Sequence, residues 1–169
     1  MHLPSEILNR EFVLEDKPVT EHLESKFQAL TTHAVRVGNI GMLLPPNEVS
    51  ELIETQPICR LPNTPAWFDG VTSVRGNMIP VFDLHELLGV ESSGSDRMII
   101  ILGSGEIATA FWVDEMPRMV MVTSDDYMSG VPPLPQLLKD HSRGYFFKDE
   151  NIWIDWNIPE FFQDLGSRL

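Results

Sequence analysis

The chain has 169 residues, 43% of them apolar, and carries a formal net charge of −13 at pH 7. This length and composition suit one globular domain with a substantial core, and the acidity argues against binding nucleic acid or an anionic membrane surface, because like charges repel. A single cysteine, Cys59, excludes an intrachain disulfide, and without an apolar leader or an apolar run of about 20 residues we expect a cytoplasmic protein with no direct membrane insertion.

Residues 1–30 differ from the rest of the chain in composition and in the spacing of their apolar residues. They are rich in charge, with Leu, Ile and Phe at spacings of three and four residues. Leu23, Phe27 and Leu30 would share one face of a short helix, and Pro18 separates the two halves of the segment. We therefore expect a partly helical N-terminal extension over residues 1–30, although a frayed tail fits the same pattern equally well.

From residue 31 onward the sequence changes to short β-like segments separated by turns. Ten segments have the alternation or the β-branched and aromatic content of strands. In chain order they are HAVRV, IGMLL, EVSELIE, GVTSV, MIPVF, RMIII, IATAFWV, RMVMV, GYFF and IWIDW. Only LHELLG and the C-terminal IPEFFQDL indicate short helices, so we expect a mainly β protein built as a barrel or sandwich.

One segment matches a nucleotide-binding fingerprint. GSGEIA, residues Gly103–Ala108, has the pattern G-x-G-x-x-A after a predicted strand. That fingerprint needs a helix to begin at the second glycine, so that the helix N-terminus faces the pyrophosphate. The following residues are β-branched and aromatic, which favours a plain hairpin turn. A small nucleotide-binding oxidoreductase therefore stays an alternative only, beside a β-barrel module for a small ligand.

Other chemistry-bearing residues do not form a catalytic set in the sequence. Asp83, His85 and Glu86 lie close together in DLHE, but no second cluster of metal ligands is visible, and a solvated helical turn explains them. Cys59 lies between prolines without a partner base. Asp114 and Glu115 are adjacent on a predicted strand, so their side chains point to opposite faces. We expect no catalytic residues, no metal, no cofactor and no enzymatic activity.

The segment CRLPNTPAWFDGVTSVRGNMIPVFDLHELLG, residues 59–89, resembles the most recognisable part of the CheW family of chemotaxis coupling proteins. Its Asn-Thr-Pro, spaced glycines, Arg-Gly and Pro-Val-x-Asp-Leu follow the family's order and spacing. The preceding VRVGNIGMLLPPNEVSELIE is similar to the family's first hairpin and next strand, and GYFFKDENIWIDWNIPEFF to its closing hairpin and helix. The resemblance covers residues 31–165, and the extension and the PAWFDG phrase look most like the pilus-associated, PilI-like branch.

The resemblance implies a fold and a role. Residues 31–169 would form two intertwined five-stranded SH3-like β-barrels with short helical turns. The protein would be a non-enzymatic adaptor that couples methyl-accepting chemoreceptors to a CheA-type histidine kinase, in chemotaxis or in type IV pilus twitching motility, at receptor arrays in the cytoplasm. One barrel would bind the kinase regulatory domain, and the groove between the barrels would bind the receptor's cytoplasmic tip.

By the same resemblance, seven positions are candidates for contact with the kinase or the receptor. They are Val49, Glu51, Leu52, Trp67, Gly70, Arg75 and Gly76. The two glycines also fit ordinary turns, and Val49 and Leu52 also fit core positions. Where the family has Asn two residues before the motif arginine, this chain has Ser73.

Arg75 itself has two readings. It could present its planar guanidinium to a partner. It could instead pair with Asp83 or Glu51 and brace the groove between the barrels, which is the reading that we favour.

Overall fold

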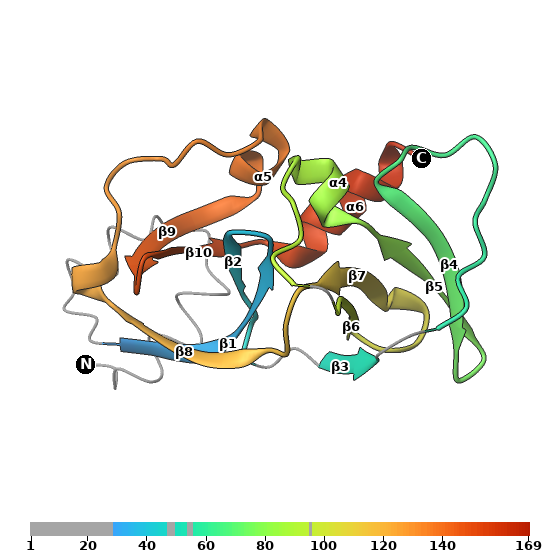
Figure 1. Ribbon diagram of the computed structural model, residues 1–169, viewed down its shortest axis with the longest axis horizontal. Helices are drawn as coiled ribbons and strands as arrows, with labels where there is room; N and C mark the ends of the chain where they lie inside the picture. The colour runs from blue at the N-terminus through green and yellow to red at the C-terminus, as the bar shows by residue number, and fades with distance from the viewer. Residues whose placement is uncertain (1–28, 47–49, 54–55, 95) are drawn as a thin grey trace.

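The computed structural model describes residues 29–46, 50–53, 56–94 and 96–169, and the remaining segments lie outside the description (Figure 1). The described residues form ten strands: β1 (Ala29–Val37), β2 (Ile40–Leu43), β3 (Ser50–Ile53), β4 (Phe68–Val74), β5 (Asn77–Phe82), β6 (Met98–Leu102), β7 (Thr109–Val113), β8 (Arg118–Thr123), β9 (Ser142–Lys148) and β10 (Asn151–Trp156). The helical elements are α4 (Leu84–Leu88), α5 (Gln136–Asp140) and α6 (Ile158–Ser167), with 3-10 turns η2 (Gly105–Ile107) and η3 (Ser124–Asp126).

The strands form two five-stranded sheets. The first has the order β8-β1-β2-β10-β9 and takes its strands from both ends of the chain. The second has the order β3-β6-β7-β5-β4 and is built from one continuous stretch. The chain therefore begins the first sheet, builds the whole second sheet and then returns to complete the first. This confirms the expected mainly β fold of two intertwined five-stranded units, which lie side by side (Figure 1).

Each sheet is closed in a similar way. The segment that follows one edge strand bends round and pairs with the opposite edge strand. In the second sheet, Cys59 follows β3 and exchanges two main-chain hydrogen bonds with Val71 of β4, at 2.8 and 3.0 Å between N and O. In the first sheet, Tyr127 follows β8 and bridges to Phe146 of β9. These bridges turn two open sheets toward barrels.

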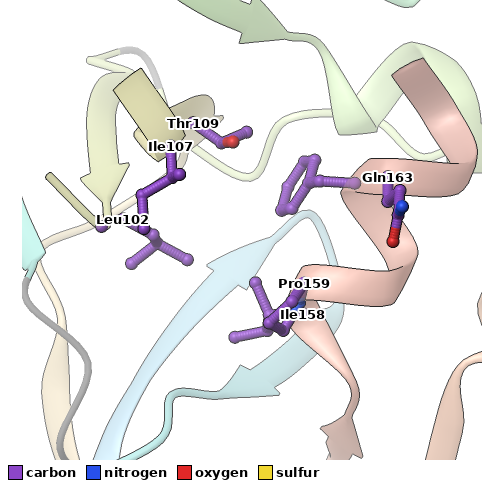
Figure 2. A pocket seen from close by; sticks show the side chains of 8 residues that line it. Leu102, Ile107, Thr109, Ile158, Pro159 and Gln163 are labelled. Carbon is purple, nitrogen blue, oxygen red and sulfur yellow. The ribbon is translucent and has the colours of Figure 1, made fainter. Parts of the chain in front are cut away.

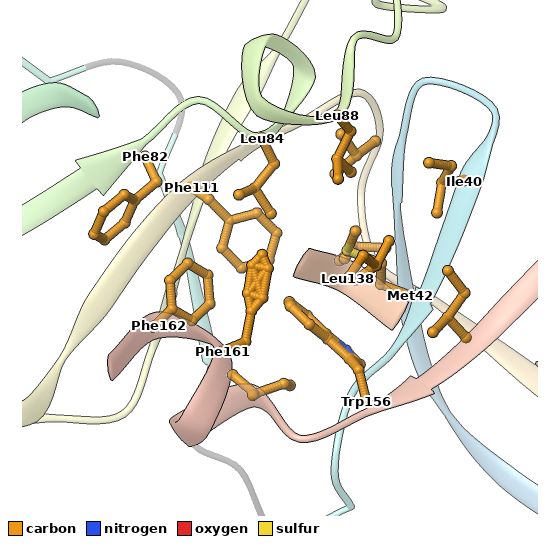
Figure 3. Packing of buried hydrophobic residues seen from close by; sticks show 14 of the residues in the cluster. Ile40, Met42, Phe82, Leu84, Leu88, Phe111, Leu138, Trp156, Phe161 and Phe162 are labelled. Carbon is orange, nitrogen blue, oxygen red and sulfur yellow. The ribbon is translucent and has the colours of Figure 1, made fainter. Parts of the chain in front are cut away.

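Three apolar clusters hold the structure together. One lies on the inner side of each sheet, and the largest lies between the two sheets. Figure 3 shows the aromatic centre of the largest cluster, where Phe161 and Phe162 of α6 meet Trp156 and Phe111. Helix α6 begins at the capping side chain of Asn157, which accepts a hydrogen bond from the Glu160 N–H. The helix that follows β10 thus fastens the first sheet to the second.

Two expectations drawn from the sequence are wrong. Leu30 does not share a helix face with Leu23 and Phe27, because it belongs to β1, pairs with Val122 and is 2% exposed in the first-sheet core. The rest of the predicted extension lies outside the described residues. His85 does not lie on a solvated helical turn, because α4 turns it inward and leaves it 5% exposed.

The segment GSGEIA forms the connection between β6 and β7. Its only helical part is η2, a three-residue 3-10 turn, and β7 follows directly. A pyrophosphate site of the dinucleotide type needs a full helix at this point. The hairpin turn expected from the sequence is confirmed, and the oxidoreductase alternative loses its structural basis.

Candidate functional site: two partner-binding surfaces

The hairpin that joins β4 to β5 ends in Arg75 and Gly76. Both residues have positive φ, 50° and 81°, and Val74 pairs with Asn77 across them. Two successive residues with positive φ form the tight type I′ turn that suits the twist of a two-stranded ribbon. A Cβ at Gly76 would meet nothing within 4 Å, so glycine is required there by the backbone conformation. The turn holds Arg75 at the tip of the hairpin.

Arg75 pairs with Glu51 of β3. Its Nη2 lies 2.5 Å from Glu51 Oε1, and the two side chains are 71% and 36% exposed. The hydrogen bond from Arg75 lowers the pKa of Glu51 below its usual value, and Glu51 in turn raises the pKa of Arg75. Strand β3 and the β4–β5 hairpin stand at opposite ends of the second sheet. The ion pair therefore links the two edges that must meet when this sheet closes.

The structure distinguishes between the two carboxylates that were expected as partners of Arg75. Glu51 is the partner, whereas Asp83 caps α4 by accepting a hydrogen bond from the Glu86 N–H. The expected position in the groove between the barrels is wrong, because the pair lies within the second sheet. A cavity of about 200 Å³ adjoins it, and all of its lining residues come from that sheet and its β6–β7 connection.

The remaining candidate residues divide between core and surface. Leu52 is half-buried and packs against the cluster between the sheets. Trp67 is half-buried and stacks on Phe82, with ring centroids 6.1 Å apart, while the neighbouring Phe68 is a core residue at 6% exposed. Val49 lies outside the described residues.

Gly70 has a structural role in the closure of the second sheet. Its φ is 137°, and a Cβ at this position would lie 2.3 Å from the carbonyl oxygen of Cys59. Cys59 is the residue that bridges to β4 at Val71. Glycine at position 70 therefore lets the segment after β3 approach the backbone of β4.

A groove of about 450 Å³ lies between the second sheet and α6 (Figure 2). Its lining is mostly apolar and comprises Leu102, Gly103, Ile107, Thr109, Ile158, Pro159, Phe162 and Gln163. Ile107, in the β6–β7 connection, is 81% exposed and stands at the edge of the groove. Because α6 continues directly from β10 of the first sheet, the groove separates the second sheet from the C-terminal part of the first.

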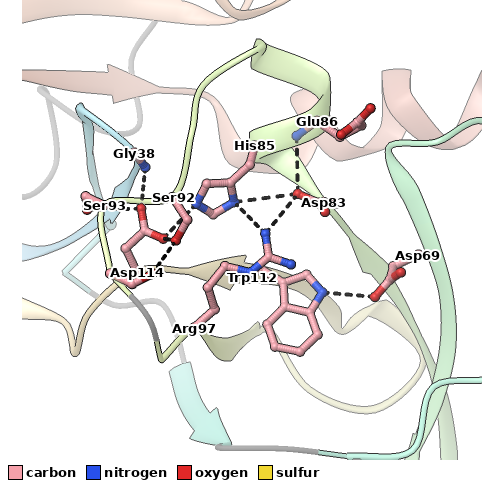
Figure 4. A network of polar contacts seen from close by, with 11 residues as sticks. Gly38, Asp69, Asp83, His85, Glu86, Ser92, Ser93, Arg97, Trp112 and Asp114 are labelled. Atoms are coloured by element: carbon pink, nitrogen blue, oxygen red, sulfur yellow. Dashed lines mark hydrogen bonds and ion pairs between the residues drawn. The ribbon is translucent and has the colours of Figure 1, made fainter.

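A polar network that the sequence did not predict joins the two sheets (Figure 4). Asp114 follows β7 in the second sheet, and its Oδ2 accepts a hydrogen bond of 2.5 Å from the N–H of Gly38, in the β1–β2 turn. The main-chain N–H of Asp114 donates to the carbonyl oxygen of Arg36, at 3.0 Å. Ser92 Oγ also donates to Asp114 Oδ1. Asp114 is thus bonded on both its backbone and its side chain to the other sheet.

His85 lies at the centre of this network. Its Nε2 is 2.8 Å from Asp114 Oδ1, and its Nδ1 is 3.3 Å from Arg97 Nη1. Because the Asp114 carboxylate only accepts, the hydrogen facing it is on Nε2, whereas Nδ1 faces both the guanidinium of Arg97 and, at 3.5 Å, Asp83 Oδ1. Burial would raise the pKa of Asp114, but the hydrogen bonds from Ser92 and Gly38, together with His85, lower it below its usual value. The carboxylate stays ionised and holds both sheets.

The geometry of this network does not fit nucleophilic catalysis. Ser92 donates to the carboxylate of Asp114 and not to the ring of His85, so the three residues do not have the Ser-His-Asp order of a nucleophilic triad. No group of three or more His, Cys, Asp and Glu residues in the described part of the chain could hold a metal ion. Among the same residues, no helix is long and apolar enough to cross a membrane.

Comparison with known proteins identifies a family by sequence and a similar solved structure by fold. The family model described as CheW-like domain matches residues 33–165. The chain is similar to Protein PilI of Pseudomonas aeruginosa, with 28% identity over 133 residues, covering 78% of this chain and 74% of that protein. It is also similar to chemotaxis protein CheW of Helicobacter pylori, with 22% identity over 108 residues and 63% of each chain covered.

Among solved structures, the fold is similar to that of the scaffolding protein TtCheW from Thermoanaerobacter tengcongensis. The TM-score is 0.64 at 20% sequence identity, covering 82% of this chain and 96% of that one. At this identity the likeness concerns the fold.

Proposed function

The chain belongs to the CheW-like domain family, and from this premise we propose that it is a non-enzymatic adaptor that couples chemoreceptors to a CheA-type histidine kinase. The similarity to PilI supports a place in a pilus-type chemosensory system that controls twitching motility. The adaptor domain would span residues 29–169, with residues 1–28 as an extension, and would work in the cytoplasm beside receptor arrays. It would bind the kinase regulatory domain and the cytoplasmic tip of a methyl-accepting receptor.

The kinase part of the proposal rests on the exposed seam of the second sheet, by which we mean the line where edge strand β3 meets the β4–β5 hairpin at Glu51 and Arg75. Strand β3 is an edge strand that pairs only with β6 among the described strands, and Glu51 and Arg75 stand beside it at the surface. The Glu51 contact engages one nitrogen of a guanidinium that carries five N–H donors. Arg75 can therefore brace the seam and contact the kinase at the same time.

We assign the receptor tip to the groove between α6 and the second sheet. Its apolar lining and its exposed Ile107 suit the apolar face of a helix, which docks side chains into such grooves. A receptor tip would then contact both the second sheet and the helix that follows the first. Ile107→Asp would weaken receptor binding and leave kinase binding unchanged.

The experiment for the kinase surface compares three variants by calorimetry with a CheA-type regulatory domain. Arg75→Ala would weaken binding at least about tenfold if Arg75 contacts the kinase, because a charge-assisted contact contributes about 1.5–3 kcal/mol. Glu51→Ala removes the brace but leaves the Arg75 guanidinium in place, and the double variant measures the coupling between the two residues. Equal affinities of wild type and Arg75→Ala would remove the contact role, and absence of binding heat from wild type at tens of micromolar would contradict the proposed function.

A further inference from the structure

A methionine-rich surface on the first sheet is not used by the adaptor sites. Met119 and Met121 of β8 are 57% and 49% exposed, although Val120 and Val122 between and beyond them are buried. Their cross-strand partners on β1 are His33 and Thr31, which are also exposed. Paired residues lie on the same face of a sheet. These four residues, Thr31, His33, Met119 and Met121, are called the Met face below.

The first described residue of the chain lies on β1, close to the Met face. Ala29, the first described residue, pairs with Thr123, and Met121 lies two residues further along the same ladder. The distance from the entry point to the first methionine is therefore about 7 Å along the strand. Residues 1–28 need no long linker to cover the Met face.

The composition of residues 1–28 suits this surface. Leu23 and Phe27 stand four residues apart near the entry point, and acidic residues outnumber basic ones in the segment. Beside the Met face, Lys148 donates its Nζ hydrogen to the carbonyl oxygen of Met121, and among the described residues it has no carboxylate partner. An apolar and acidic segment would bury the methionines and place carboxylates near this ammonium group.

We propose that residues 1–28 pack back on the Met face, with Leu23 and Phe27 covering Met119 and Met121. The tether supports this occupant over a separate protein. A segment joined at the edge of its own site has an effective concentration in the millimolar range, so a weak apolar contact is enough to keep it bound. Methionine side chains also adapt their shape to an irregular partner surface.

Peroxide oxidation of the full-length protein tests the proposal, with methionine sulfoxide measured at each position by mass spectrometry. Met78, on β5 of the other sheet and 62% exposed, is the internal reference. In wild type, Met119 and Met121 should oxidise at least about threefold more slowly than Met78. The double variant Leu23→Asp with Phe27→Asp should abolish that protection. The matched variant Ser25→Asp with Gln28→Asp, which adds the same charge at polar positions, should retain it.

Three results would overturn the proposal. One is equal oxidation of Met78, Met119 and Met121 in wild type. Another is protection that survives Leu23→Asp with Phe27→Asp and grows with protein concentration, which would assign the Met face to a second copy of the chain. The third is equal loss of protection in both double variants. Far-UV circular dichroism of every variant checks that the sheets remain folded.

Discussion

Asp114 offers the sharpest test of how the two sheets are held together. Asp114→Ala removes the acceptor of the Gly38 N–H and of His85 Nε2, both of which are buried in the network. Each buried donor left without a partner costs about 1–3 kcal/mol, so the two together lower the free energy of unfolding by about 2–6 kcal/mol. Urea unfolding followed by tryptophan fluorescence measures this change directly.

The neighbouring residue supplies the control. Glu115 lies 3.7 Å from Arg118 through side chains that are both about half exposed, so Glu115→Ala should change stability by less than about 1 kcal/mol. Because the pKa of Asp114 is lowered in the folded protein, its contribution is present above the usual aspartate pKa and is lost as the pH falls through the folded value. Asp114→Ala should therefore also flatten the acid limb of the stability profile. If Asp114→Ala behaves like Glu115→Ala, the network does not join the sheets.

Two further predictions concern other buried positions. Burial raises the pKa of Asp155 to about 7 despite the nearby Arg143, so the unfolded chain ionises first as the pH rises, and stability falls between about pH 4 and pH 7 and then levels. Asp155→Asn should remove this loss of stability. Urea unfolding midpoints of the wild type and the variant at pH 5 and pH 8 check it, and an equal pH dependence of the two proteins would contradict it. Gly70→Ala should destabilise the protein by about 3 kcal/mol or more, since its Cβ would meet the Cys59 carbonyl oxygen. Gly76→Ala, with open space around it, should cost only about 1 kcal/mol of backbone strain, and similar thermal midpoints for the two variants would refute the closure role of Gly70.

Local patterns predicted the elements whose causes are local. Alternation placed strands such as β1, in which one side faces a core and the other is more exposed to solvent. The turn between β4 and β5 is expected at Gly76-Asn77 from residue preferences, but it lies one residue earlier, at Arg75-Gly76, and Asn77 begins β5. The helix near residue 158 followed from its apolar spacing and is confirmed, although it continues to Ser167.

The interactions that join distant parts of the chain could not be predicted in this way. Strand β8 pairs with β1 although the whole second sheet lies between them in the sequence, and no local signal marks that pairing. The family resemblance implied two intertwined five-stranded units but not this pairing. The sequence alone indicates a solvated helical turn for His85 and shows no partner for Asp114. Both side chains are buried because they pair with each other and with further polar groups, such as the Gly38 N–H, and these pairings exist only in the folded chain.

The sequence placed Arg75 correctly on a hairpin but misjudged its surroundings. The family resemblance suggested a position at the groove between the barrels, whereas the carboxylate partner of Arg75 stands on β3 of the same sheet. The position of β3 depends on the order of strands in the sheet and not on the adjacent sequence. The role of Arg75 toward a partner stays a prediction.

Co-sedimentation with receptor-bearing membranes tests the central claim most directly. A CheA-type kinase and membranes that carry its receptor are mixed with and without this protein, and the kinase in the pellet is measured. The adaptor account predicts that the kinase sediments with the membranes only when the protein is added, and that the protein sediments with it. Kinase recovery that is independent of the protein, with the protein itself left in the supernatant, would contradict the account.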